Sequence, residues 1–480
     1  MSLGFRKFRD NSSKLSKPLN PQTNIMYQKK PEIGKGIDWL MVWLFAALVL
    51  IGLMCIFSVE YKNGDAVVQS FLGFKKEYSK QLFFFIATII VASFILLTDS
   101  KLFTATANLT YTFGILLILA TFVVGKEVGG SKSWIPLGFM NIQPVEVCKI
   151  FTSLALAKYL SMPDLDFSKT RSQLIAAAIA FSPAILSVLQ KEPGAAIVYF
   201  SFGIAFYREG LPAIYLVLLF SLTVLIIASI VVPPNALFIA LTIIALLFVY
   251  IYKRKIKRDK MILVLIAGVW LLCVGTQKFL VPALFEKVLK PHQVVRIFAT
   301  FGIDDYKFKS PERTAEIQKE FGKLGTVKKG SGEKVESYNV KQSKIAIGSG
   351  GFWGKGFLQG TQTRGEFVPA QNTDFIFSSV GESFGWVGCV ILMLLYFGIM
   401  FRLIFLAERQ RSTFSRVYIY CVVGILFFHV ALNVCMTLGL APSPGITLPL
   451  LSYGGSSLVT FTILLFIAIK LDADRQMVLR

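Results

Sequence analysis

Residues 338–388 read YNVKQSKIAIGSGGFWGKGFLQGTQTRGEFVPAQNTDFIFSSVGESFGWVG, a long stretch that is neither a simple apolar helix nor a short connector. Its glycines permit backbone bends and close approaches that a side chain would block. Hydroxyl and amide side chains follow, and Asp374 and Glu382 then stand inside or beside the apolar run FIFSSV. Carboxylates at the mouth of a membrane helix are costly unless they face a polar cavity. The stretch is therefore predicted to carry function, with the remaining chain as its scaffold.

The composition around this stretch is that of a polytopic membrane protein. The 480 residues are 54% hydrophobic and 16% charged, with a mean hydropathy of +0.63. The net charge of +22 comes from basic clusters between apolar spans, which usually set orientation and do not indicate nucleic acid. The six cysteines show no paired spacing, so neither a disulfide framework nor a metal site is predicted. His292 and His429 are far apart, and His429 is predicted to be a packing residue.

Apolar segments of about 20 residues predict an all-α polytopic fold of about 10–12 transmembrane helices with a large extracytoplasmic loop. The candidate spans are 37–58, 82–98, 103–124, 147–161, 172–190, 193–208, 211–232, 235–252, 261–281, 385–405, 417–437 and 455–471. The predicted divisions are a basic cytoplasmic tail (1–36), an amino-terminal bundle (37–281), an outer loop (282–384), carboxy-terminal helices (385–471) and a cytoplasmic tail (472–480).

Charge predicts the orientation of these spans. The basic amino terminus, the cluster 253–260, the arginines of 402–416 and the carboxy-terminal tail all fall on one side of the alternating spans. Because basic loops favour the cytoplasm, both termini are predicted to be cytoplasmic. The amino terminus lacks the short apolar region of a signal peptide, so no cleaved signal is expected. The polar connectors 125–146, 282–384 and 438–454 are then extracytoplasmic.

Within the outer loop, residues 310–337 are polar and without apolar periodicity. They are predicted to be a mobile, solvated insertion. A surface that docks a partner or an anionic ligand is the alternative.

Three motifs, all predicted to face outward, point to one family. They are SKSWIPLGFMNIQPVEVCK (131–149), the AIGSGG, GTQT and TDFIF elements of 346–377, and LPLLSYGGSS (448–457). Together they resemble the SEDS family (shape, elongation, division and sporulation), typified by RodA and FtsW, over about residues 37–475. GTQT and QSKIAIGSGG are more similar to the RodA branch. The family usually has ten spans, so the helix pair near 211–252 is predicted to be additional.

The resemblance implies a peptidoglycan glycosyltransferase that polymerises lipid II at the outer face of the cytoplasmic membrane. It further implies a role in cell elongation and shape, with a class B penicillin-binding protein and other cell-elongation membrane proteins as partners. The family's general base is a loop aspartate in an inverting displacement. It carries over to Asp305, with Asp304 as the adjacent alternative and Glu312 or Glu336 as further ones, because the insertion interrupts the motif. The upstream LKPHQVVRI element supplies Gln293 and Arg296.

Other polar residues of the motifs are candidates for substrate binding. Lys132 and Lys149 could provide positive charge for a pyrophosphate, and Trp134 an aromatic face for a sugar. Glu146 and Lys149 are three residues apart and could pair with each other, so a structural salt bridge is an equal alternative. The full set is Lys132, Trp134, Gln143, Glu146, Lys149, Glu192, Arg296, Thr361, Gln362, Thr373, Asp374, Glu382, Ser452, Gly454 and Gly455.

Particular expectations attach to some of these candidates. Glu192 stands in QKEPGA where the family often has QPDLGT, and it is expected to line the cavity. Asp374 and Glu382 would share a helix face if a helix begins near Thr373, and Asp374 could equally anchor the loop. The glycines of SYGGSS allow either close helix packing or an exposed helix start able to receive an anion. No fixed cofactor is identified, and Mg²⁺ or Mn²⁺ bound with the substrate pyrophosphate is the candidate.

Two other functions remain open at this point. A flippase or transporter of a lipid-linked precursor would also combine many helices with intramembrane carboxylates. A transporter should place its essential charges near the bilayer midplane, whereas the candidates here fall at outer helix ends, which favours the polymerase. A non-catalytic scaffold would tolerate replacement of these carboxylates.

Overall fold

The computed structural model describes residues 36–62, 74, 76–128, 131–136, 141–190, 192–289, 291, 294–295, 298, 311–323, 338–441 and 445–475. In chain order its helices are α1 (Trp39–Glu60), α3 (Glu77–Leu97), α4 (Ser100–Val124), α5 (Pro144–Leu160), α6 (Thr170–Leu189), α7 (Pro193–Val198), η1 (Tyr199–Ser201), α8 (Phe202–Arg208), α9 (Ala213–Val231), α10 (Pro234–Ile251), α11 (Lys253–Ile256), α12 (Met261–Gly275), η2 (Thr276–Leu280), α13 (Val281–Ala283), η3 (Leu284–Val288), α15 (Pro311–Lys323), α16 (Tyr338–Ser349), α17 (Thr361–Arg364), α18 (Ile376–Glu408), α19 (Thr413–Thr437) and α20 (Gly455–Ala473).

The predicted membrane spans are confirmed as helices. Within the described ranges, ten helices are long and apolar enough to cross a membrane: α1, α3, α4, α6, α9, α10, α12 continued to Glu286, α18, α19 and α20. The two remaining predicted spans form α5, which has 17 residues, and the shorter helical stretch from α7 to α8. The protein is thus a multi-pass helical membrane protein.

Local sequence signals explain where several helices begin. The Asp38 side chain accepts a hydrogen bond from the Met41 backbone N–H, which caps α1. Proline occupies the first positions of α5, α7 and α10, where its missing N–H has no intrahelical acceptor to lose.

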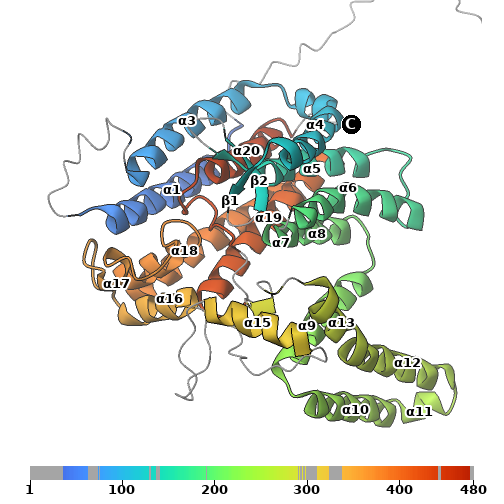
Figure 1. The fold of residues 1–480 in the computed structure, drawn as a ribbon. Coiled ribbons are helices and arrows are strands. Elements are labelled where there is room, and N and C mark those ends of the chain that lie inside the picture. Colours follow the sequence, from blue (N-terminus) through green and yellow to red (C-terminus); the bar gives the residue numbers. More distant parts are fainter. Residues whose placement is uncertain are drawn as a thin grey trace, which may run out of the picture.

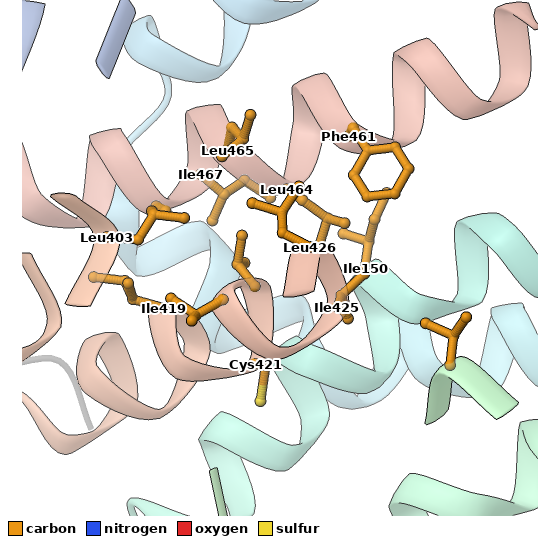
Figure 2. Close-up of a cluster of buried hydrophobic side chains, with 14 of the residues drawn as sticks. Ile150, Leu403, Ile419, Cys421, Ile425, Leu426, Phe461, Leu464, Leu465 and Ile467 are labelled. Carbon is orange, nitrogen blue, oxygen red and sulfur yellow. The ribbon is translucent and has the colours of Figure 1, made fainter. Parts of the chain in front are cut away.

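The core of the bundle lies between α5, α18, α19 and α20 (Figure 1). Ile150, Leu403, Leu426 and Leu464 bring these four helices together in the cluster of Figure 2. In the apolar window of α20, 78% of the residues are buried, against 6% in α10. A helix that is apolar on all sides must be covered either by other helices or by lipid. Helix α20 is therefore an interior helix, whereas α10 faces lipid.

Helices α10 and α12 form a hairpin that extends away from the bundle, with α11 at its tip (Figure 1). We call α9 to η3 the arm. Polar contacts between its helices include Gln277 Nε2, which donates to the Pro234 carbonyl at 2.6 Å, and Trp270 Nε1, which donates to Thr242 Oγ1 at 3.3 Å. The predicted helices near 211–252 are α9 and α10, and so lie in this arm.

Part of the predicted mobile insertion is a helix that packs on the arm. In α15, Ile317 is buried in a cluster with Ile230, Phe285 and Phe298. Arg313 donates to the backbone carbonyls of Phe285 and Leu289. The prediction of a mobile segment is therefore wrong for 311–323, whereas the predicted solvent exposure is confirmed for most of its described side chains. The helix docks through Ile317 and Arg313 on one face, and its other residues are mostly polar, so its overall hydrophobicity is too low to indicate a packed helix. Residues 324–337 lie outside the described part.

The connector 125–146 forms a small antiparallel sheet of order β1-β2-β3. Its strands are β1 (Lys126–Val128), β2 (Ser131–Pro136) and β3 (Asn141–Ile142), with Ile135 of β2 opposite Ile142 of β3. The sheet ends next to the first turn of α5, so β2 is held close to that helix.

The glycine-rich stretch crosses α18 at a break in that helix. Gly385 has φ 64° and ψ −160°, a conformation almost confined to glycine. The backbone N–H groups of Trp386 and Val387 donate to the carbonyls of Gly351 and Phe352 at 2.9 and 3.2 Å. A Cβ on Gly354 would lie 2.3 Å from the Ser383 carbonyl oxygen. The predicted close backbone approach is confirmed.

At the helix ends farthest from the Gly385 break, arginines pair with carboxylates. Arg402 donates to Asp38 at 2.6 Å, and Arg409 bonds Asp472, so that α18 is joined to the start of α1 and the end of α20. Arg416 and Arg208 pair with Glu209 and Glu408 in the same way, joining α8 to α18 and α19. These pairs hold together the ends of helices that are distant in sequence.

Candidate active site

A cavity of about 380 Å³ lies at the other end of the bundle, where the three sequence motifs meet. Its wall comes from β2 and β3, the first turn of α5, the α6–α7 junction, the residues before α18, the segment 445–447 and the start of α20. The lining residues are Trp134, Asn141, Gln143, Glu146, Glu192, Ala195, Thr373, Asp374, Gly445, Ile446, Thr447, Tyr453, Gly454, Gly455, Ser456 and Ser457.

Many of the residues predicted from sequence lie together in this wall. They are Trp134, Gln143, Glu146, Glu192, Thr373, Asp374, Gly454 and Gly455. Ser452 supports the wall from behind, because its Oγ donates to the Thr373 carbonyl at 2.6 Å and accepts from the Leu448 N–H at 2.8 Å. The bundle thus collects at one place residues more than 300 positions apart in the chain.

Lys149 stands behind Glu146 and is fully buried. Its Nζ lies 2.6 Å from Glu146 Oε2 and 2.7 Å from His429 Nε2. The predicted Glu146–Lys149 pair is confirmed, with the carboxylate turned to the cavity and the ammonium covered by protein.

Glu192 is fixed at the junction between α6 and α7. Its Oε1 accepts from Ser133 Oγ of β2 at 2.8 Å. Its carbonyl accepts from Ser187 Oγ, and its N–H donates to the Ser187 carbonyl at 3.0 Å. The carboxylate therefore stays at the cavity wall even though the side chain is one methylene longer than aspartate.

Asp374 shares the cavity with Glu192. Burial is the largest influence and raises the pKa of Asp374 from its usual value of 3.8 to about 6, the Thr373 hydroxyl opposes this, and the Glu192 carboxylate adds to it. Asn433 Nδ2 donates at 2.7 Å to the backbone carbonyls of both Asp374 and Ile446. Asp374 is thus held in place and can exchange a proton at mildly acidic pH.

Helix α20 begins at the cavity. Gly454 precedes it with φ 154°, and the first N–H groups of a helix have no intrahelical acceptor. Ser457 Oγ lies 3.1 Å from Thr447 Oγ1. Among the described residues, no group hydrogen-bonds the buried Ser456 Oγ. The positive end of a helix dipole, lined by glycine and serine, suits a bound anion.

The GTQT element forms a separate cluster that does not line the cavity. Buried Glu382 accepts from the backbone N–H groups of Gln362 and Thr363, each at 2.8 Å, and from Lys355 Nζ at 2.7 Å. Thr361 Oγ1 lies 3.3 Å from the same carboxylate. Thr361, Gln362 and Glu382 therefore anchor α17 to α18, and substrate contact by them stays a prediction.

The condition under which Asp374 and Glu382 would share a helix face, a helix that begins near Thr373, is not met. Helix α18 begins at Ile376, so Asp374 precedes it and turns to the cavity. Gln293, Arg296, Asp304 and Asp305 lie outside the described residues, as does the side chain of Lys132.

Sequence reasoning missed residues that support the wall, chiefly His429, Asn433, Thr447 and Ser133. His429 was predicted only to pack, and it does pack edge-on against Phe461, with the two ring centroids 4.9 Å apart. It also forms a hydrogen bond with Lys149. His429 and Asn433 are four residues apart in an otherwise apolar helix. Two polar residues with that spacing lie on one helix face, and this is the signal that would have indicated them.

Within the described part of the chain, no group of three or more His, Cys, Asp or Glu side chains could hold a metal ion. Mg²⁺ commonly binds through one or two carboxylates together with substrate phosphates. Glu192 and Asp374 beside the start of α20 fit that arrangement, because they offer carboxylate oxygens next to a place suited to phosphate.

Known proteins of one family resemble this chain over most of its length. The family model of the FtsW, RodA and SpoVE cell cycle proteins matches residues 38–236 and 232–477. The chain is 30% identical over 459 residues to peptidoglycan glycosyltransferase RodA of Treponema pallidum, covering 91% of this chain and 97% of that protein. It is 28% identical over 367 residues to peptidoglycan glycosyltransferase MrdB of Escherichia coli K12, covering 76% of this chain and 78% of that protein.

Solved structures have the same fold. A chain from a study of how a peptidoglycan synthase complex coordinates polymerization and crosslinking superposes with a TM-score of 0.62 at 23% identity, over 92% of this chain and 99% of that chain. The rod shape determining protein RodA of Thermus thermophilus superposes with a TM-score of 0.56 at 22% identity, over 93% and 100%. The chain therefore belongs to the FtsW, RodA and SpoVE family of cell cycle proteins, the SEDS family.

Proposed function

We propose that this protein is a peptidoglycan glycosyltransferase that polymerises lipid II into glycan strands. The observation that carries the proposal is the convergence of the three motifs on one cavity that holds Trp134, Glu146, Glu192 and Asp374. The names of the T. pallidum and E. coli relatives support the same activity. The similarity to RodA of T. pallidum, which extends over almost the whole length of that protein, supports a role in cell elongation and shape.

The cavity is proposed to open at the outer face of the cytoplasmic membrane. The cavity lies at the helix ends opposite the arginine pairs. Counting the alternating spans places the basic tip of the arm, residues 253–260, on the same side as those arginines. Basic segments favour the cytoplasm. Both termini are then cytoplasmic, and polar substrate groups reach the cavity from outside.

Within the cavity, the substrate pyrophosphate is proposed to lie at the start of α20. The first-turn N–H groups and the unpaired Ser456 hydroxyl supply donors there. Trp134 offers an aromatic face to a sugar ring. If Mg²⁺ or Mn²⁺ accompanies the pyrophosphate, Glu192 and Asp374 would hold it, and it would neutralise charge on the leaving group.

The proposed reaction is an inverting displacement at the anomeric carbon. A carboxylate takes the proton from the attacking sugar hydroxyl, the new C–O bond forms, and the bond to the lipid pyrophosphate breaks. Asp305 is the proposed base, with Asp304 as its alternative. Asp374, which lines the cavity and whose pKa is raised to about 6 by burial, is a further candidate.

A class B penicillin-binding protein is proposed as the partner that crosslinks the product. The similarity to a chain from the work on a peptidoglycan synthase complex supports this.

The test is glycan formation from purified lipid II by the purified protein with its partner. Asp305→Asn, Asp304→Asn and Asp374→Asn each keep the side-chain size and remove a carboxylate. We expect loss of polymer by at least about a hundredfold for the base, in line with general-base catalysis, while lipid II still binds. Equal polymer from all three variants would exclude them as the base. A folded wild-type protein that makes no polymer but moves lipid II across vesicles would support the transporter instead.

A further inference from the structure

Behind the cavity wall, a chain of hydrogen bonds joins two sides of the site. It runs from Glu146 through Lys149 Nζ to His429, with distances of 2.6 and 2.7 Å. It continues from His429 Nδ1 to the Thr447 carbonyl at 3.2 Å. The Thr447 hydroxyl then lies 3.1 Å from Ser457 Oγ in the first turn of α20. Glu146, Thr447 and Ser457 line the cavity, whereas Lys149 and His429 are buried behind it.

The hydrogen-bond partners of the two ring nitrogens determine the tautomer and charge of His429. The Thr447 carbonyl can only accept, so Nδ1 must carry a hydrogen to bond it. A lysine ammonium can only donate, so Nε2 must be without one. The ring is therefore the neutral Nδ1–H tautomer. It receives a hydrogen bond from Lys149 on one side and donates to the cavity segment on the other.

The remaining surroundings leave the ring little freedom. Phe461 of α20 packs edge-on against it. Glu146 is the carboxylate that contacts this pair within the described residues, and the nearby Tyr199 hydroxyl donates to the Val145 carbonyl at 2.8 Å. Glu192 and Asp374 face the cavity side. Lys149 thus depends on Glu146 and His429 as the acceptors of its hydrogen bonds.

We propose that His429 is a positioning residue whose Nε2 fixes the Lys149 ammonium against Glu146, while its bond to the Thr447 carbonyl only orients the ring for that contact. This rests on the proposed transferase function. With His429 in place, the Glu146 carboxylate keeps one direction and one charge at the cavity. Without the Nε2 acceptor, a buried ammonium loses one of its partners and draws the Glu146 carboxylate away from the substrate.

Two substitutions of similar polarity separate the contributions of the two ring nitrogens. In His429→Gln the amide stands at the depth of Nε2 and can still accept from Lys149. In His429→Asn the amide lies as far from the backbone as Nδ1 does, so it can donate to the Thr447 carbonyl but cannot reach Lys149. We expect kcat for glycan formation within about threefold of wild type for Gln and at least about tenfold lower for Asn, the range for a lost hydrogen bond to a charged group. KM for lipid II should change little in both.

The control removes the ammonium. In a Lys149→Met background the Gln and Asn variants should make polymer at the same residual rate, because there is no longer a cation for position 429 to hold. If His429→Asn does not fold, His429→Leu with Lys149→Met removes both polar groups, and this double variant should match Lys149→Met alone.

Equal kcat for Gln and Asn, with both proteins folded, would overturn the proposal, as would a loss confined to KM. A difference between Gln and Asn that persists without Lys149 would also contradict it. These results are distinct from failure of the proposed function, which would appear as absence of polymer from folded wild-type protein.

Discussion

Asp374 shows how position in the fold changes the chemistry of a single residue. It precedes α18, so its carboxylate is turned to the cavity, where burial and Glu192 raise its pKa to about 6. Glu382, only eight positions later, is instead enclosed by the α17 N–H groups and Lys355. Sequence placed both residues at a polar site, but only the exact start of the helix decides which one meets the cavity.

The raised pKa of Asp374 predicts how stability depends on pH. A carboxyl group whose pKa is higher in the folded than in the unfolded protein binds its proton more tightly when folded. Its contribution to stability is therefore present below about pH 4 and is lost as the pH rises to about 6. The expected loss is about 3 kcal/mol.

Asp374→Asn should remove this dependence. Relative to the variant, the thermal unfolding midpoint of wild type should fall between pH 4 and 7, measured in one detergent across the series. Parallel midpoints for the two proteins over this range would contradict the assigned pKa shift.

At the scale of elements, the break of α18 at Gly385 aligns the glycine-rich stretch with the bundle. The sequence indicated that glycines in 348–360 allow two backbone segments to approach closely. The predicted span, 385–405, begins at the residue where the helix breaks. Hydropathy alone did not extend the predicted span over residues 376–384, which are already helical. Two polar residues there interrupt the apolar pattern because they bond neighbouring helices, Ser378 to Ser343 of α16 and Glu382 to the backbone of α17.

Gly385→Ala should strongly destabilise the protein. The backbone there is nearly restricted to glycine, and a Cβ would lie 2.3 Å from the Gly354 nitrogen. We expect a loss of more than about 3 kcal/mol, from strain and the clash together. Gly348→Ala is the matched control, because a Cβ there meets nothing within 4 Å and alanine favours the helix. Thermal midpoints that fall equally for both would show that the break is dispensable.

For the whole molecule, hydropathy and charge were sufficient to predict the spans and the fold class, because membrane helices must satisfy their backbone internally. The cavity could be anticipated only as a set of candidates. Its formation depends on contacts such as Ser133 with Glu192 and Asn433 with Asp374, which join helices that are distant in sequence. No periodicity within one segment contains that information.

The proposed orientation predicts which residues are reachable from outside the cell. In a variant without the native cysteines, Glu366→Cys, near the cavity end, should react with a membrane-impermeant maleimide in intact cells. Lys255→Cys, at the tip of the arm, should react only after the membrane is opened. Both side chains are exposed, so labelling after permeabilisation is the control for each. The reverse pattern would invert the topology.

The arm also couples the molecule to the thickness of the bilayer. Eighteen residues of α10 rise about 27 Å, close to the roughly 30 Å of hydrocarbon in a membrane. Because protein packing covers so little of α10 and α12, hydrophobic mismatch, and not the bundle, sets their tilt. Helix α15 rests on the base of this arm through Ile317 and Arg313. Spin-label distances between α15 and α16 in lipids of different acyl length should therefore change, while distances within the α5, α19 and α20 core stay constant.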